Sequence, residues 1–149
     1  MKKELTLRER AVAMLARREH TRAELARKLA PHAGEDEDLE GLLDDLVRRK
    51  LLSDQRYAEA RTTSLTRKFG VRRIEHELRQ SGVSGEAAAA ATASARATEV
   101  ERAREAWRKR FKAPPVSRAE RAKQMRFLQG RGFSYDAIRA VIAGADEDA

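Results

Sequence analysis

Apolar residues recur along most of the chain at intervals of three and four, which is the spacing of one helix face. The pattern is clear at residues 7–15 and again at residues 39–46. No stretch alternates with the period of two that a half-buried strand requires. The pattern therefore predicts an all-α fold of about nine helices, near residues 6–18, 21–29, 36–50, 54–68, 71–81, 85–97, 99–112, 117–130 and 135–143.

Residues that start and stop helices separate these segments. Three hydroxyl residues stand three positions before a glutamate, which is the pattern of a capping box at a helix start. Glycine and proline, which end helices, fall between the predicted segments. The predicted capping boxes are Thr6 with Glu9, Thr21 with Glu24, and Ser117 with Glu120.

An internal repeat is visible when "LRQSGVSGEAAAA" from Leu78 is laid over "LQGRGFSYDAIRA" from Leu128, at an offset of 50. Both segments have a helix, a glycine stop, an apolar residue (Val83 or Phe133) that would fill the corner, and a second helix. The first third follows the same plan less closely. We therefore expect an elongated, curved array of three three-helix modules, at residues 1–53, 54–98 and 99–145, with an acidic tail at 146–149.

Composition restricts the classes of partner and compartment. The formal net charge is +8, with 32 Lys and Arg against 24 Asp and Glu, which favours a polyanion or an assembly that contains one. The absence of cysteine excludes disulfides and zinc-thiolate sites and fits a reducing compartment. No apolar run approaches the ~20 residues of a membrane span. We expect a cytoplasmic protein with no membrane segment.

Candidate catalytic and metal-binding groups are few. His20, His32 and His76 lie far apart and are expected at the surface or its boundary. The acidic run "GEDEDLEGLLDD" from Gly34 lacks the ligand spacing of a calcium loop and is typical of a helix start, where negative charge is favoured. No phosphate-binding loop is present. The sequence predicts neither an enzyme nor a metal or cofactor site.

Basic clusters are the stronger signal. Arg67, Lys68, Arg72 and Arg73 surround Gly70, so that four cations lie within reach of one anionic partner. The stretch "TRAELARKL" followed by "LEGLLDDLVRRKLL" also has the layout of a helix-turn-helix. A winged helix would continue into two strands, whereas "SDQRYAEARTTSLTRK" has a helical pattern. The net charge and this layout leave a stand-alone DNA-binding transcription factor as the alternative hypothesis, against which the missing wing counts.

Four motifs in one order resemble the RecX family: "REHTRAEL" from Arg18, "LLSDQRYAEA" from Leu51, "GVRRIEHELRQSGV" from Gly70 and "RFLQGRGFS" from Arg126. The resemblance covers nearly the whole chain. It implies three tandem three-helix repeats and a non-enzymatic regulator, without cofactor, that binds the RecA recombinase filament on single-stranded DNA. Family members mostly inhibit the ATPase, strand exchange and coprotease activities of RecA.

Two features of this chain depart from the family pattern. Leu51 to Asp54 occupy a corner where the family more commonly has glycine, a tyrosine or leucine, and acidic residues, and the segment 86–97 is unusually rich in alanine.

We expect a monomer that also binds DNA weakly and without sequence preference. The residues expected to contact the filament are Arg22, Arg56, Tyr57, Arg67, Lys68, Arg72, Arg73, Arg126 and Arg131.

Overall fold

The computed structural model describes residues 4–147, and all regular structure in that range is helical. This confirms the all-α fold class. The elements in chain order are α1 (Leu7–Arg17), α2 (Arg22–Leu29), a 3-10 turn η1 (Ala30–His32), α3 (Leu39–Arg48), α4 (Asp54–Leu65), α5 (Val71–Gln80), α6 (Gly85–Ala97), α7 (Glu99–Arg110), α8 (Arg118–Gly130) and α9 (Tyr135–Glu147).

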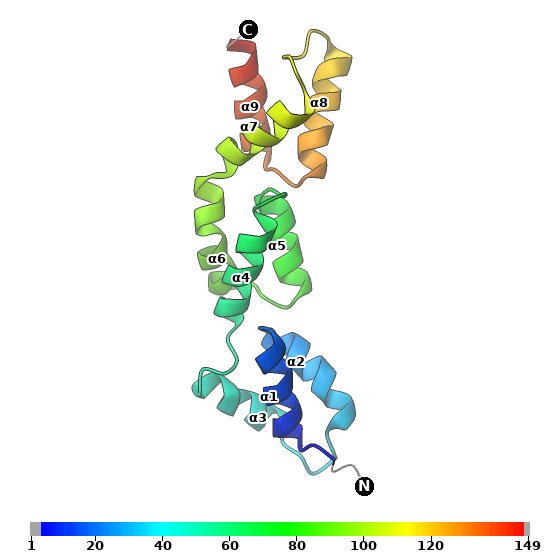
Figure 1. Cartoon of the computed structure of the whole chain (residues 1–149), viewed down its shortest axis with the longest axis vertical. Helices are drawn as coiled ribbons and strands as arrows, with labels where there is room; N and C mark the ends of the chain where they lie inside the picture. The colour runs from blue at the N-terminus through cyan, green and yellow to red at the C-terminus, as the bar shows by residue number, and fades with distance from the viewer. Residues whose placement is uncertain (1–3, 148–149) are drawn as a thin grey trace.

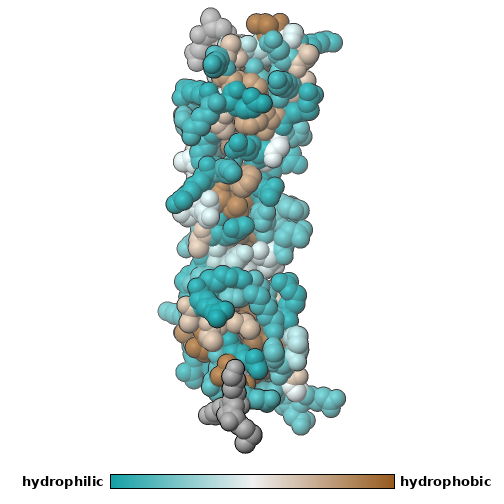
Figure 2. All heavy atoms as spheres, turned by 45° about the vertical axis from the view of Figure 1, so that its right-hand side comes forward, coloured by the Kyte–Doolittle hydropathy of each residue, from teal (hydrophilic) through white to brown (hydrophobic). Residues whose placement is uncertain are grey.

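The helices form three bundles that are stacked along one long axis, with the chain ends at opposite ends of the stack (Figure 1). Three separate clusters of buried residues lie in these bundles, one each within α1–α3, α4–α6 and α7–α9. Polar side chains cover most of the face shown in Figure 2. The expected elongated helical array is confirmed. The module boundaries stay a prediction, and part of the predicted acidic tail, residues 148–149, lies outside the described residues.

Module 1 has a core of leucines that the apolar pattern predicts. Leu25 and Leu29 from α2 and Leu43 and Leu46 from α3 are completely buried. α1 begins with the complete predicted capping box, in which the Thr6 side chain accepts from the Glu9 amide and the Glu9 carboxylate accepts from the Thr6 amide. Local start signals and tertiary burial agree in this module.

The alanine-rich helix α6 packs closely against α4. The contact is made by small residues on both helices, and Ala58, Thr62, Ala91 and Ala95 are all buried. Small side chains allow two helix backbones to approach closely, because little volume separates them. Packing inside module 2 therefore explains the small residues on the inner face of α6, whereas Ala89, Ala90, Ala93 and Ala97 are exposed.

The two repeated corners have the same backbone structure. Gly82 follows α5 with a φ of 91° and Gly132 follows α8 with a φ of 83°, both in the left-handed region that glycine tolerates best. The next residues, Val83 and Phe133, are 1% and 2% exposed. Each donates its amide proton back to a leucine carbonyl five residues earlier, at 2.8 and 3.2 Å. The predicted glycine stop and apolar plug are confirmed at both corners.

Two of the three predicted capping boxes form only one of their two bonds. Thr21 accepts from the Glu24 amide, but the Glu24 carboxylate binds the guanidinium of Arg18 instead of returning to the cap. Ser117 accepts from the Glu120 amide, and the Glu120 carboxylate binds the amide one residue before the cap. In both places a competing donor takes the carboxylate.

Two further expectations need correction. The helix predicted from residue 36 begins at Leu39, because Asp38 caps it by accepting from the Gly41 amide at 2.9 Å. His20 is buried, with 3% of its surface exposed, although it was expected at the surface or its boundary. Its Nδ1 lies 3.1 Å from the Arg18 carbonyl and its Nε2 lies 3.3 Å from Lys28 Nζ.

Candidate protein and nucleic-acid interface

Modules 1 and 2 meet where the start of α2 lies against the corner between α5 and α6; we call this contact the first joint. The Thr21 hydroxyl donates to the Ser81 carbonyl at 2.5 Å. The Arg22 amide donates to the carboxylate of Asp54, the first residue of α4, at 2.8 Å. Thr21 is completely buried, so the start of α2 is part of an internal contact.

Three of the predicted contact residues lie at the first joint. Arg56 donates from Nε to Glu19 at 2.8 Å, and the Tyr57 hydroxyl lies 2.8 Å from the Ser81 hydroxyl oxygen. Arg22 is bonded through Nη2 to two carboxylates of α3, which raise its pKa. All three are half-buried. Of the three side chains, only that of Arg56 bonds across the joint, to Glu19 of module 1, and a role of the three in binding a partner stays a prediction.

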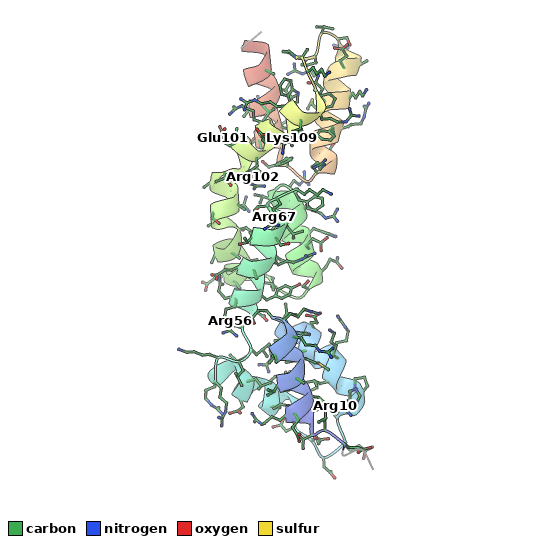
Figure 3. The ribbon with its side chains drawn as sticks, viewed as in Figure 1. Arg10, Arg56, Arg67, Glu101, Arg102 and Lys109 are labelled. Atoms are coloured by element: carbon green, nitrogen blue, oxygen red, sulfur yellow. The ribbon has the colours of Figure 1, made fainter. Side chains whose placement is uncertain are left out.

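A shallow hollow of about 510 Å³ lies beside the first joint. It is lined by Arg22 and Arg56, which are far apart in the sequence, and by Lys50. Figure 3 shows Arg56 between the lower and middle bundles. The hollow is the place where these predicted residues could meet one ligand group.

Modules 2 and 3 meet where the start of α5 lies against the corner between α8 and α9; we call this contact the second joint. The Gly70 amide donates to the Arg131 carbonyl at 2.9 Å, and the Arg72 amide donates to the Gly132 carbonyl at 3.0 Å. An added Cβ on Gly70 would collide with the backbone of residues 132–133. The glycine is therefore required for close approach of the two modules.

Five predicted contact residues gather at the second joint. Arg67, Lys68, Arg72 and Arg73 are exposed, and Arg131 reaches them from module 3. Arg73 is bonded to Glu77 and stacks over Phe69, with its guanidinium carbon 4.8 Å from the ring centroid. Arg131 donates to the Lys68 carbonyl at 3.4 Å. The structure thus joins two clusters that lie about 60 residues apart in the sequence, and their binding role stays a prediction.

A carboxylate that the sequence analysis did not single out lies at the centre of the second joint. Glu99, the first residue of α7, is 6% exposed. It accepts from the Val71 amide at 2.9 Å, the Ser134 amide at 3.1 Å and the Ser134 hydroxyl at 2.6 Å. An acidic first residue of a helix was the available signal, and it also occurs at Asp54.

Arg102 is a second residue that sequence reasoning missed. Its guanidinium donates to the carbonyls of Phe69 and Ala95, at 2.6 and 2.8 Å, and thereby ties α7 to the ends of α4 and α6. Burial of the side chain lowers its pKa. Nothing in the sequence separates this arginine from the many exposed ones.

An arginine and phenylalanine cluster lies on α7 and α8. The rings of Phe111 and Phe127 meet edge to face, with centroids 5.4 Å apart. The guanidinium carbon of Arg110 lies 5.4 Å from the first ring and 5.9 Å from the second, and that of Arg131 lies 5.1 Å from the second. Arg126, another predicted contact residue, is exposed on α8. The sequence signal was an arginine beside or four residues from each phenylalanine.

The excess positive charge is concentrated in module 3. Residues 99–145 contain twelve Lys and Arg against five Asp and Glu, whereas residues 1–53 contain twelve against eleven. Part of the charge in module 1 is paired within the module. Its described ion pairs include those of Arg8, Arg18, Arg22, Arg48 and Arg49.

Neither a metal site nor a membrane span is found within the described residues. No group of three or more His, Asp or Glu side chains in residues 4–147 could hold a metal ion. None of the helices described is both long and apolar enough to cross a bilayer.

Comparison with protein families identifies two of the three modules. Residues 53–91 match the family model "RecX, second three-helix domain", and residues 97–142 match "RecX, third three-helix domain". The fold is similar to a crystal structure of RecX from Lactobacillus salivarius, with a TM-score of 0.82, 23% sequence identity and 95% of each chain covered.

Curated relatives match the chain over almost its full length. The "Regulatory protein RecX" of Leptothrix cholodnii is 48% identical, over 97% of this chain and 92% of the relative. The protein of the same name from Herbaspirillum seropedicae is 46% identical, over 97% of this chain and 95% of the relative. With two matched domains and relatives this similar, the chain belongs to the RecX family of regulatory proteins.

Proposed function

We propose that this protein binds the filament of the RecA recombinase on single-stranded DNA and regulates it, chiefly by inhibiting its ATPase, strand-exchange and coprotease activities. The observation that carries the proposal is the near full-length similarity to regulatory RecX proteins. The protein acts by binding in the cytoplasm and not by catalysis.

The shape and charge of the molecule support this mode of action. A stack of three modules offers contact surfaces along its whole length (Figure 1). Contacts on a repeating filament add up through effective concentration, so individually weak contacts give stable binding when several form together. Exposed cations at the second joint and on module 3 suit a partner that contains DNA.

The alternative, a sequence-specific transcription factor, is disfavoured by the helix that would read bases. In a helix-turn-helix made from α2 and α3, the reading helix would be α3. That helix carries Glu40, Asp44 and Asp45, which DNA phosphates would repel. The segment after it forms α4 where a wing would be required.

The proposed function is tested with the cognate recombinase. DNA-dependent ATP hydrolysis and strand exchange are measured while this protein is added, and filament binding is followed by co-sedimentation. We expect both activities to fall and the protein to sediment with filaments. Unchanged activities at stoichiometric amounts, together with no sedimentation, would refute the proposal.

The second joint is tested as part of the filament interface by Arg67→Gln with Arg72→Gln. Both side chains are exposed, so helix content should stay intact while filament binding weakens several-fold. A matched control is Arg17→Gln with Arg27→Gln, which removes the same charge from exposed positions of module 1. Equal inhibition of the recombinase by the joint variant and the wild type would remove these residues from the interface.

A further inference from the structure

Three arginines of module 3 lie over aromatic rings, and two of them share one ring. Arg110 and Arg131 both stack on Phe127, with guanidinium carbons 5.9 and 5.1 Å from its centroid. Neither forms an ion pair among the described residues. This differs from five arginines of module 1, which are bonded to glutamate or aspartate: Arg8, Arg18, Arg22, Arg48 and Arg49.

Stacking and ion pairing have opposite consequences for a ligand. A guanidinium over a ring is held by attraction to the ring face, which leaves its N–H donors unoccupied by a carboxylate. Arg131 uses one donor in the long bond to the Lys68 carbonyl. The remaining donors can bind a phosphate in the two-pronged geometry that guanidinium and phosphate share. An arginine that is already bonded to carboxylates must first give up those bonds.

The position of the pair also matters. Because both guanidinium groups lie on one ring, they can meet phosphates of the same short stretch of strand. Lys109 and Lys112 flank Arg110 in the sequence and are exposed, so the pair lies within a positive surface (Figure 3 labels Lys109). A surplus of seven positive charges over one module fits a polyanion better than a short acidic peptide.

We propose that Arg110 and Arg131, held on Phe127, bind the phosphate backbone of single-stranded DNA, so that module 3 is the part of the protein that contacts DNA. This inference rests on the proposed function and assigns its DNA contact to particular residues. The nearly balanced module 1 then contributes contacts to protein. Recognition is through the backbone, so binding does not depend on base sequence.

This phosphate contact is tested on the full chain with a labelled oligothymidylate and no recombinase, by fluorescence anisotropy over a series of salt concentrations. On single strands the slope of log K against log salt changes by about 0.7 for each phosphate contact. Arg110→Gln with Arg131→Gln should therefore reduce the slope by about 1.4 and weaken binding. The control pair Arg17→Gln with Arg27→Gln removes the same net charge and should change the slope much less.

Three outcomes refute the proposed phosphate contact. They are no binding of oligothymidylate by the wild type at low salt, an unchanged slope in the double variant, or an equal reduction of the slope in the control variant. Loss of recombinase binding with unchanged oligothymidylate binding would assign the two arginines to a protein contact and also refute the phosphate contact. Arg131 is half-buried, so Arg110→Gln alone serves as a second variant. At that exposed position the fold should persist, with a slope reduction of about 0.7.

Refutation of the phosphate contact is distinguishable from refutation of the proposed function. If the wild-type protein inhibits the recombinase and the salt slope of the double variant is unchanged, only the phosphate contact is refuted. A wild-type protein without effect on recombinase activity or filaments refutes the proposed function, whatever the oligothymidylate measurements give.

Discussion

The two joints between modules have one plan and are built from different groups. At the first joint, a threonine hydroxyl at the start of α2 bonds the corner carbonyl of Ser81, and Asp54 accepts from the following amide. At the second joint, the Gly70 amide bonds the corner carbonyl of Arg131, and Glu99 accepts from the following amide. An acidic first residue of the next module therefore caps the middle helix of the preceding one in both places.

The difference lies in burial and in the number of bonds. Glu99 is 6% exposed and accepts one bond from module 2 and two from Ser134 of its own module, whereas Asp54 is half-buried and accepts one from module 1. The second joint also has two backbone bonds between modules. Only Thr98 separates α6 from α7, while five residues separate α3 from α4. We therefore expect modules 2 and 3 to move as one unit and module 1 to be attached less firmly.

The largest expected effect is on the buried carboxylate. Glu99→Ala leaves two backbone amides and a hydroxyl without their acceptor, and should lower the free energy of unfolding by roughly 3 kcal/mol. Asp54→Ala removes one bond at a half-exposed position and should cost about 1 kcal/mol. Urea unfolding of both variants measures the difference. Equal costs would show that the two joints do not differ in strength.

The corner glycines should rank in the same order. An alanine at Gly132 or Gly82 is strained by the positive φ, at about 1 to 2 kcal/mol. The added Cβ at Gly132 would also meet Arg73, including its backbone nitrogen at 2.8 Å, while that at Gly82 would meet the Cβ of Ala23 at 2.6 Å. Thermal unfolding should thus show a larger loss for Gly132→Ala than for Gly82→Ala.

A second substitution sharpens this glycine comparison. Ala23→Gly removes the methyl group that Gly82→Ala would collide with, and should restore part of the lost stability. Arg73→Gly should not rescue Gly132→Ala to the same extent, because the backbone contact remains. Equal rescue at both corners would contradict a tighter second joint.

The smallest expected effect is a loss of stability of module 1 at acid pH. Arginines bonded to Glu24 and Asp45 lower the pKa of each carboxyl group to about 2, chiefly through Arg18 and Arg8. Their usual values are 4.5 and 3.8, so this stabilisation is complete above about pH 4.5 and is lost as the pH falls toward 2. Melting curves over that interval should show module 1 weakening.

The variant Asp45→Asn should remove part of this pH dependence, since its carboxylate bonds to three arginines are lost at every pH. Asp36→Asn, at an exposed position, is the matched control. Identical pH profiles for Asp45→Asn and the wild type would show that the ion pairs of Asp45 do not stabilise module 1.

Much of the fold could be predicted because its signals are local. Apolar spacing and the glycine corners give all the helices of the described region to within a few residues at most ends. The failures have tertiary causes. The carboxylate of Glu24 binds Arg18, which approaches it only when α1 and α2 fold together, and buried His20 lies between the Arg18 carbonyl and Lys28 of α2.

The candidate site was less predictable for a similar reason. The cluster around Gly70 could be read from adjacent residues, but its union with Arg131 depends on how modules 2 and 3 meet. Arg22 and Arg56 could be recognised as cations, while their bonds to carboxylates of other helices could not. Which arginines are paired and which are stacked is decided by packing.

An image of this protein on a RecA filament assembled on single-stranded DNA tests the central claim most directly. The account predicts that the whole stack of modules lies along the filament and contacts more than one recombinase subunit, with module 3 nearest to the DNA. A protein found only on bare duplex, or attached to filaments through one module with the others projecting into solvent, would contradict it.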